Sequence, residues 1–139
     1  MSFRLSTLQF LQFFLWGSWF VTAGTYLLEN LGFSGREVGL VYATTAIAAT
    51  ISPFIVGVLA DRFFSVEKLL SLLHFVGGCL LFGISYIREF EWFYPAILIY
   101  MFCYLPTFSL TNSLCFHHIK DIKNDFPRVR VWGTVSWIL

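Results

Sequence analysis

Long apolar runs are the feature that most constrains what this chain can fold into. They cover about residues 5–28, 38–60, 69–87 and 92–115, and a further run begins at about residue 127. A helix rises about 1.5 Å per residue, so about 20 apolar residues cross the hydrocarbon core of a bilayer. Only 12% of the residues are charged, whereas a soluble domain has about a quarter. The sequence therefore predicts an all-α membrane protein with four transmembrane helices and the start of a fifth.

The basic residues are distributed unequally over the predicted loops. If the N-terminus is cytoplasmic, Arg36 and Arg88 lie outside and all other basic residues lie inside: Arg4, Arg62, Lys68, Lys120, Lys123, Arg128 and Arg130. Cytoplasmic loops are enriched in Lys and Arg, so this bias predicts a multi-pass protein of the cytoplasmic membrane with its N-terminus inside. The net charge of +1 and the lack of a basic patch argue against a nucleic-acid partner.

The fifth run places three unlike side chains on one helical face. Arg130, Thr134 and Trp137 are spaced i, i+4 and i+7, which brings them into one stripe. A guanidinium, a hydroxyl and a flat ring can together bind a polar ligand that has a planar part. The pattern is also typical of an interfacial arginine that extends to lipid headgroups while the other two residues pack. Spacing alone favours the second interpretation and leaves the first open.

Two further faces indicate how the helices pack. Gln9, Gln12, Trp16 and Trp19 recur at helical spacing in the first run, which indicates either a packing seam or the wall of a cavity. The second run carries small residues at helical spacing, a pattern that lets membrane helices approach closely. An alternative hypothesis is therefore a small four-helix membrane protein that acts by helix association. The three cysteines lack the spacing of a metal site and are interpreted as packing residues.

The segment before the fifth run mixes apolar and charged residues. Phe116–Asn124 is typical of a short amphipathic interfacial helix. We then expect Asp125 to cap the fifth helix, with Pro127 in its first turn. His117, His118 and Asp121 raise the alternative of a membrane metal enzyme. Because no further ligand lies nearby, we expect no metal, no cofactor and no enzymatic activity.

The end of the second run carries a recognisable motif. Gly57, Asp61 and Arg62 follow the pattern G-x-x-x-D-R, which resembles the signature between the second and third spans of the major facilitator superfamily. The signature usually continues with glycine and further basic residues, whereas this chain has Phe64, Ser65 and Val66. The resemblance implies that Asp61 favours one gate state by pairing with a helix dipole or an arginine.

Other segments resemble a narrower family, the proton-linked nucleoside permeases. Leu11–Trp19 is similar to their first span, Tyr104–Thr107 with Asn112 and Ser113 to their fourth, and Asp125–Thr134 to their fifth. The resemblance runs along essentially the whole chain. The fifth-span pattern is also similar to that of the lactose permease group, in which the equivalents of Arg130 and Trp137 contact the sugar. A fragment of a sugar:proton symporter is therefore a further alternative.

The resemblance implies a twelve-helix fold of which residues 1–139 form an incomplete N-terminal six-helix half. It implies proton-coupled nucleoside transport, with the bilayer, a nucleoside, a proton and the remaining C-terminal spans as partners. The expected substrate-binding residues are Arg130, Thr134, Trp137, Trp16 and Asn112. No carboxylate lies deep in a predicted span, so the proton-coupling acid is expected outside these residues. Residues 1–139 alone are expected to be inactive.

Overall fold

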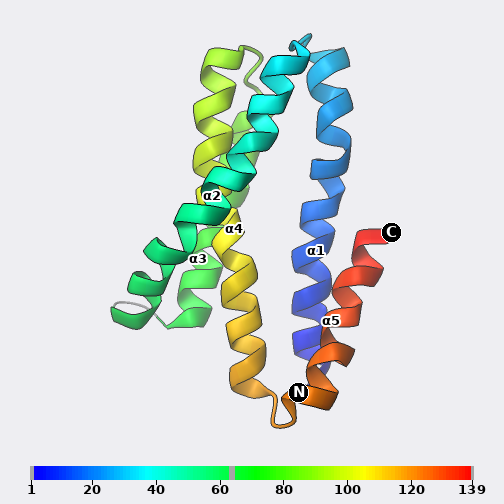
Figure 1. The fold of residues 1–139 in the computed structure, drawn as a ribbon, viewed down its shortest axis with the longest axis vertical. Helices are drawn as coiled ribbons and strands as arrows, with labels where there is room; N and C mark the ends of the chain where they lie inside the picture. The colour runs from blue at the N-terminus through cyan, green and yellow to red at the C-terminus, as the bar shows by residue number, and fades with distance from the viewer. Residues whose placement is uncertain (1, 63–64, 139) are drawn as a thin grey trace. The chain divides into compact units, whose positions relative to one another are not determined.

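The computed structural model describes residues 2–62 and 65–138, and only the backbone of residue 2 and residues 59–62. These described residues form five α-helices and one π-helical turn (Figure 1). The elements are α1 (Ser2–Thr25), η1 (Tyr26–Asn30), α2 (Gly35–Arg62), α3 (Val66–Ile84), α4 (Phe90–His118) and α5 (Ile122–Ile138). This arrangement confirms the predicted all-α fold of four long helices and a fifth.

The first two long helices are joined by a short, well-defined connection. The π-turn η1 continues α1 directly, and the Leu31 N–H donates to the Tyr26 carbonyl oxygen at 3.2 Å. Gly32 then adopts a positive φ of 70°, a conformation that costs glycine little. Helix α2 starts with a capping box. The Glu37 carboxylate accepts from the Ser34 N–H at 2.7 Å, and the Glu37 N–H donates to the Ser34 hydroxyl at 3.3 Å.

The junction between α4 and α5 corrects the sequence prediction. No separate interfacial helix covers Phe116–Asn124, because α4 continues to His118 and α5 already begins at Ile122. The cap is Asp121 rather than Asp125. One Asp121 carboxylate oxygen accepts from the Asn124 N–H at 3.3 Å, and the other accepts from the Asn124 side-chain amide at 2.7 Å. Pro127 consequently lies inside α5 rather than in its first turn.

Three of the described helices are long and apolar enough to cross a membrane. They are the segments Gly35–Val58, Val66–Ile84 and Phe90–His118. Helix α1 has 24 residues and is also long enough, but its buried glutamines Gln9 and Gln12 reduce its hydropathy. Polar side chains within a membrane helix usually face the protein interior, so the two glutamines mark the packed side of α1.

The chain divides into two compact units, and the first contains the predicted ligand residues of α5. It comprises Met1–Gly24 and Thr111–Leu139. Within it α1 and α5, blue and red in Figure 1, lie side by side. Leu5, Cys115 and Val129 form a buried core against which Ile119 and Phe126 pack. One residue of α1, one of α4 and one of α5 therefore hold this unit together.

The second unit, Thr25–Leu110, is built from α2, α3 and most of α4. Helices α3 and α4 approach closely, since a Cβ added at Gly77 would lie 3.7 Å from the Tyr100 ring. Helices α2 and α4 are joined by the Thr45 hydroxyl, which donates to the Met101 sulfur at 4.0 Å. The Phe33 ring packs edge-on against the Phe93 ring, 5.5 Å away, and thereby fixes the connection before α2.

Large apolar side chains cover much of the outer surface of the described helices. Phe54 and Phe75 are 78% and 73% exposed, and Phe82 and Trp92 are exposed to a similar degree. Exposed apolar groups on this scale are unusual in water-soluble proteins and are what helices present to lipid. The surface therefore agrees with the multi-pass membrane architecture.

Candidate ligand-binding site

The predicted stripe of α5 is present in the structure. Helix α5 is continuous from Ile122 to Ile138, so Arg130, Thr134 and Trp137 lie on one face. All three side chains are exposed, Trp137 to 40%. The buried residues of the helix, Val129, Gly133 and Ser136, lie along the neighbouring face. The stripe thus borders the packed side of α5 and remains accessible to a ligand.

Protein groups hold the guanidinium of Arg130 from two sides. The Nη1 atom donates a hydrogen bond to Asn112 Oδ1 at 3.4 Å. The Cζ atom lies 5.5 Å from the centroid of the Phe13 ring, within the range of a cation–π contact. Asn112 belongs to α4 and Phe13 to α1, so three helices meet at this one side chain.

The Asn112 side chain is shared between two donors. Its Oδ1 atom also accepts a hydrogen bond from Gln9 Nε2 at 3.1 Å. The same Gln9 nitrogen lies 3.6 Å from the Cys115 sulfur, to which it donates a second, weaker bond. Gln9 is 1% exposed, whereas Arg130 is exposed. The result is a small polar cluster of Gln9, Asn112 and Arg130 that runs from the buried side of α1 to the accessible side of α5.

Two glycines allow α1 and α5 to approach each other at the site. A Cβ added at Gly133 would lie 2.6 Å from the Phe13 ring, a distance that real Cβ atoms essentially never show. A Cβ added at Gly17 would lie 3.3 Å from Trp137 Cε3. The Trp137 ring therefore lies against the backbone of α1, and the Phe13 ring lies against the backbone of α5.

Of the remaining predicted substrate contacts, Trp16 lies on α1 and Thr134 on α5. Trp16 is half-buried and makes ring contacts along its own helix, with Phe20 stacked at 4.3 Å and Trp19 edge-on at 5.6 Å. It immediately precedes Gly17, the residue on which Trp137 rests. Thr134 is exposed one turn after Arg130. The structure thus brings Arg130 and Asn112 into direct contact, and it places Thr134 and Trp137 on the same face.

The predicted gating motif lies in the second unit. Gly57 is exposed in α2, and a Cβ added there would meet no atom within 4 Å. The backbone of Asp61 and Arg62 forms the last turn of α2, while their side chains lie outside the described residues. The motif thus lies at the C-terminal end of α2. Because the Asp61 side chain is not described, the pairing predicted for it stays a prediction.

The electrostatics of the site are those of a single uncompensated cation. Among the described residues, Arg130 has a neutral amide and an aromatic ring as partners and no salt bridge. Those residues also contain no group of three or more His, Cys, Asp or Glu side chains that could hold a metal ion. The alternative metal site at His117, His118 and Asp121 therefore lacks a ligand set. An accessible guanidinium in apolar surroundings favours a ligand with acceptor oxygens.

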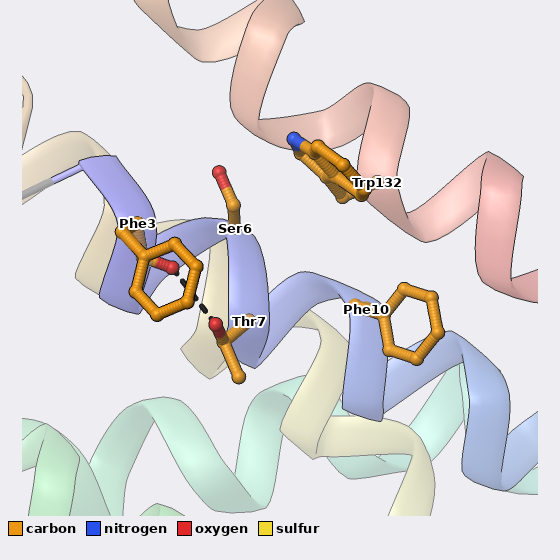
Figure 2. A pocket seen from close by; sticks show the side chains of 5 residues that line it. All are labelled: Phe3, Ser6, Thr7, Phe10 and Trp132. Carbon is orange, nitrogen blue, oxygen red and sulfur yellow. Dashed lines mark hydrogen bonds between the residues drawn. The ribbon is translucent and has the colours of Figure 1, made fainter.

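A groove beside α1 and α5 is distinct from this site. It has a volume of about 340 Å³ and is lined by Phe3, Ser6, Thr7, Phe10 and Trp132, as Figure 2 shows. Its two hydroxyl groups belong to α1, and that of Thr7 donates to the Phe3 carbonyl oxygen at 2.9 Å. Trp132 follows Arg130 by two residues, which places it on nearly the opposite side of α5 at roughly 100° per residue. Three of these five lining residues are aromatic, and none of the five is charged.

Phe13 is not among the site residues predicted from the sequence, although its ring contacts two residues of the fifth helix. Its ring lies against Gly133 and below the Arg130 guanidinium. The signal was available, because Phe13 follows Gln9 by four residues and precedes Trp16 by three, on the same helical face. The chain has seventeen phenylalanines, however, and nothing in the sequence distinguishes Phe13 from the others.

Comparison with known proteins gives a consistent result. A family model described as "Nucleoside H+ symporter" matches residues 1–139. The chain is 45% identical over 135 residues to the putative nucleoside transporter YegT of Escherichia coli K12, covering 97% of this chain and 32% of that protein. It is 37% identical over 140 residues to the nucleoside permease NupG of Escherichia coli K12, covering 98% and 34%. A crystal structure of NupG superimposes with a TM-score of 0.93 over 99% of this chain and 35% of that one. The chain thus spans about a third of the length of these relatives.

Proposed function

Since the chain belongs to the nucleoside H+ symporter family, we propose that it is the N-terminal part of a proton-coupled nucleoside transporter of the cytoplasmic membrane. The observation that carries the proposal is the accessible Arg130 guanidinium, held between the Asn112 amide and the Phe13 ring. Transport rather than catalysis agrees with the relatives, which are named as transporters and permeases. The distribution of basic residues supports a cytoplasmic N-terminus.

The three residues of the α5 stripe have complementary roles in nucleoside binding. Arg130 has N–H groups that remain after its bond to Asn112, and these donate to a sugar hydroxyl or a base carbonyl oxygen. The Thr134 hydroxyl adds a second polar contact one turn away. The flat face of Trp137 stacks on the base or the sugar ring. Trp16 and Asn112 form part of the wall behind the ligand.

The neutrality of Asn112 matters for this binding mode. A carboxylate at this position would form an ion pair with Arg130 and compensate its charge. The amide holds the guanidinium by a hydrogen bond while leaving the positive charge available to the ligand. A nucleoside is uncharged but rich in acceptor oxygens, and this chemistry suits a cation with several directed donors.

Proton coupling is assigned to the part of the transporter beyond residues 1–139. The buried polar side chains of the described residues are amides and hydroxyls, and none of them is an acid. A coupling carboxylate must be shielded from bulk water to exchange its proton in step with the substrate. Transport further requires the C-terminal half, against which this part rocks about the binding site. Gly57, Asp61 and Arg62 are proposed as the gating motif at the end of α2.

The test is uptake of labelled uridine and adenosine by cells that lack their own nucleoside permeases and express the full-length protein. We expect uptake above the vector control, competition by unlabelled nucleosides, and loss of accumulation on adding a protonophore. Uptake that a protonophore leaves unchanged would reject proton coupling. Uptake of a labelled disaccharide without uptake of nucleosides would instead support the sugar symporter.

A further inference from the structure

We infer that Gln9 is a positioning residue for Arg130 and that it acts through the side-chain amide of Asn112. The inference rests on the proposed function only in taking Arg130 as the ligand contact. Gln9 lies on α1, and the direct contacts of its amide nitrogen are with Asn112 and Cys115 rather than with Arg130. Its influence on the ligand site therefore passes through one intermediate side chain.

Two hydrogen-bond donors converge on one oxygen of Asn112. Asn112 Oδ1 accepts from Gln9 Nε2 at 3.1 Å and from Arg130 Nη1 at 3.4 Å. A carbonyl oxygen has two lone pairs, so both are used. If the Asn112 amide turned over, its NH₂ group would face two other donors. Both donors therefore favour the orientation in which Asn112 presents its oxygen to Arg130, and Gln9 supplies one of them.

The polar cluster has a buried end at Gln9 and an exposed end at Arg130. Gln9 is 1% exposed, so its amide cannot exchange its protein partners for bulk water. The Cys115 sulfur, also fully buried, holds the Gln9 nitrogen from a second direction. Arg130 is exposed and has a long flexible side chain. The buried glutamine of α1 therefore restrains Asn112, and Asn112 in turn restrains the exposed arginine of α5.

The position of the Arg130 guanidinium is restrained before any ligand binds. A hydrogen bond to Asn112 fixes the in-plane direction of the Arg130 guanidinium, and the contact with the Phe13 ring restrains its plane. Together the two contacts hold the remaining N–H donors in place before a ligand arrives. Side chains ordered in advance cost less entropy when the ligand binds. Loss of Gln9 should consequently weaken binding without removing any group that touches the ligand.

Nucleoside affinity of the full-length transporter is the first readout. Gln9→Met keeps the length of the side chain but removes the donor, and it should weaken binding about threefold to tenfold. Gln9→Asn keeps an amide but is one methylene shorter, and it serves as a second variant if the first does not fold. Cys115→Ser is the matched control, because it keeps a small acceptor beside Gln9 and leaves Asn112 intact. Its affinity should stay within about twofold of the wild type.

A double-mutant cycle separates positioning from general damage. In an Arg130→Lys background, Gln9→Met should cause no further loss of affinity, because the side chain that it positions is already gone. If the two losses multiply instead, Gln9 acts independently of Arg130 and the inference is wrong.

The last readout needs no ligand and is therefore independent of the proposed function. Phenylglyoxal modifies accessible arginines, and mass spectrometry gives the rate at Arg130 relative to Arg128 in the same protein. Gln9→Met should raise this ratio severalfold, whereas Cys115→Ser should leave it unchanged. Equal ratios in the wild type and both Gln9 variants would overturn the inference. A raised ratio in a protein that binds no nucleoside would retain the positioning role and reject the proposed function.

Discussion

Arg130 is exposed on α5, yet its guanidinium is not left to lipid headgroups in this structure. It contacts Asn112 and the ring of Phe13, and thereby connects α5 to α4 and α1. Arg128, two residues earlier, is also exposed but lies on a different face of the helix. Two arginines of equal charge and similar depth are therefore in different surroundings, and this difference can be tested.

We predict that Arg130→Lys weakens nucleoside binding and that Arg128→Lys does not. An ammonium cannot reproduce the planar, multi-donor geometry of a guanidinium, and loss of a charged hydrogen bond costs roughly 1.5–3 kcal/mol. This corresponds to about a tenfold to hundredfold lower affinity. Equilibrium binding to the two purified full-length variants gives the answer. Equal affinities would identify Arg130 as a topological anchor and remove it from the site.

The sequence predicted the exposed half of the site better than its buried half. Helical spacing was enough to place Arg130, Thr134 and Trp137 on one face, because it depends only on local geometry. The partners of Arg130 depend on how α1, α4 and α5 pack, and Asn112 is separated from Arg130 by eighteen positions. The family resemblance supplied Asn112 as a candidate. Neither spacing nor resemblance gave the contact of Phe13 with Gly133.

At the scale of elements, the contact between α1 and α5 depends on Gly133. We predict that Gly133→Ala destabilises the protein, although alanine favours a helix by about 1 kcal/mol over glycine. The added Cβ would lie 2.6 Å from the Phe13 ring, which is rigid and must shift as a whole. Overpacking of this kind costs about 1–3 kcal/mol. The measurement is thermal unfolding in detergent.

Two controls make the cause specific. Gly39→Ala in α2 adds a Cβ with no atom within 4 Å and should be neutral or stabilising. Phe13→Leu combined with Gly133→Ala should recover part of the lost stability, because leucine is smaller and more adaptable than a ring. If the double variant is no more stable than Gly133→Ala alone, the clash with Phe13 is not the cause.

The start of α5 predicts a dependence on pH. Hydrogen bonds from the Asn124 side chain and backbone lower the pKa of Asp121 below its ordinary value. A carboxyl group with a folded-state pKa below its unfolded-state value stabilises the fold above the unfolded-state pKa. That stabilisation is lost as the pH falls through the folded-state pKa. Asp121→Ala should therefore accelerate amide hydrogen exchange in the first turn of α5 at neutral pH. Its difference from the wild type should shrink in acid.

Asp125→Ala is the matched control for this experiment. Asp125 lies in the same first turns of α5, and its N–H donates to the Asp121 carbonyl oxygen at 2.9 Å. Its carboxylate makes no described hydrogen bond to the helix N-terminus, so the variant should exchange like the wild type at neutral pH. Faster exchange in Asp125→Ala than in Asp121→Ala would restore the cap that the sequence predicted.

The two errors at this junction have one physical cause. The pattern of Phe116–Asn124 is typical of an independent amphipathic helix, and Pro127 is typical of a helix start. In the structure the Phe116 ring packs against the Phe126 ring, 4.6 Å away, across a connection of three residues. This ring contact favours a long α4 and an early start of α5 over a separate helix between them. A single sequence gives no measure of that packing, whereas the long apolar runs identify the helices themselves.

At the scale of the whole molecule, the proposed ligand residues would form only one side of a site. Arg130, Thr134 and Trp137 remain exposed on α5, and the relatives are about three times as long as this chain. Alternating access needs two halves that move about a shared site near the middle of the bilayer. On this mechanism, residues 1–139 would present the proposed ligand-binding groups without being able to enclose a ligand.

We accordingly predict that residues 1–139 expressed alone do not transport nucleosides. A cavity that is open on one side cannot alternate its access, and the proposed proton-coupling acid lies outside these residues. The measurement is uptake of labelled nucleoside in a host without its own nucleoside permeases, with membrane insertion verified by fractionation. The positive control is the same residues joined to the C-terminal two thirds of NupG, which shares 37% identity over this region. Uptake by residues 1–139 alone, above the vector control, would contradict the two-half mechanism. Because the host supplies no related partner, such uptake would mean that copies of this segment form a pathway among themselves.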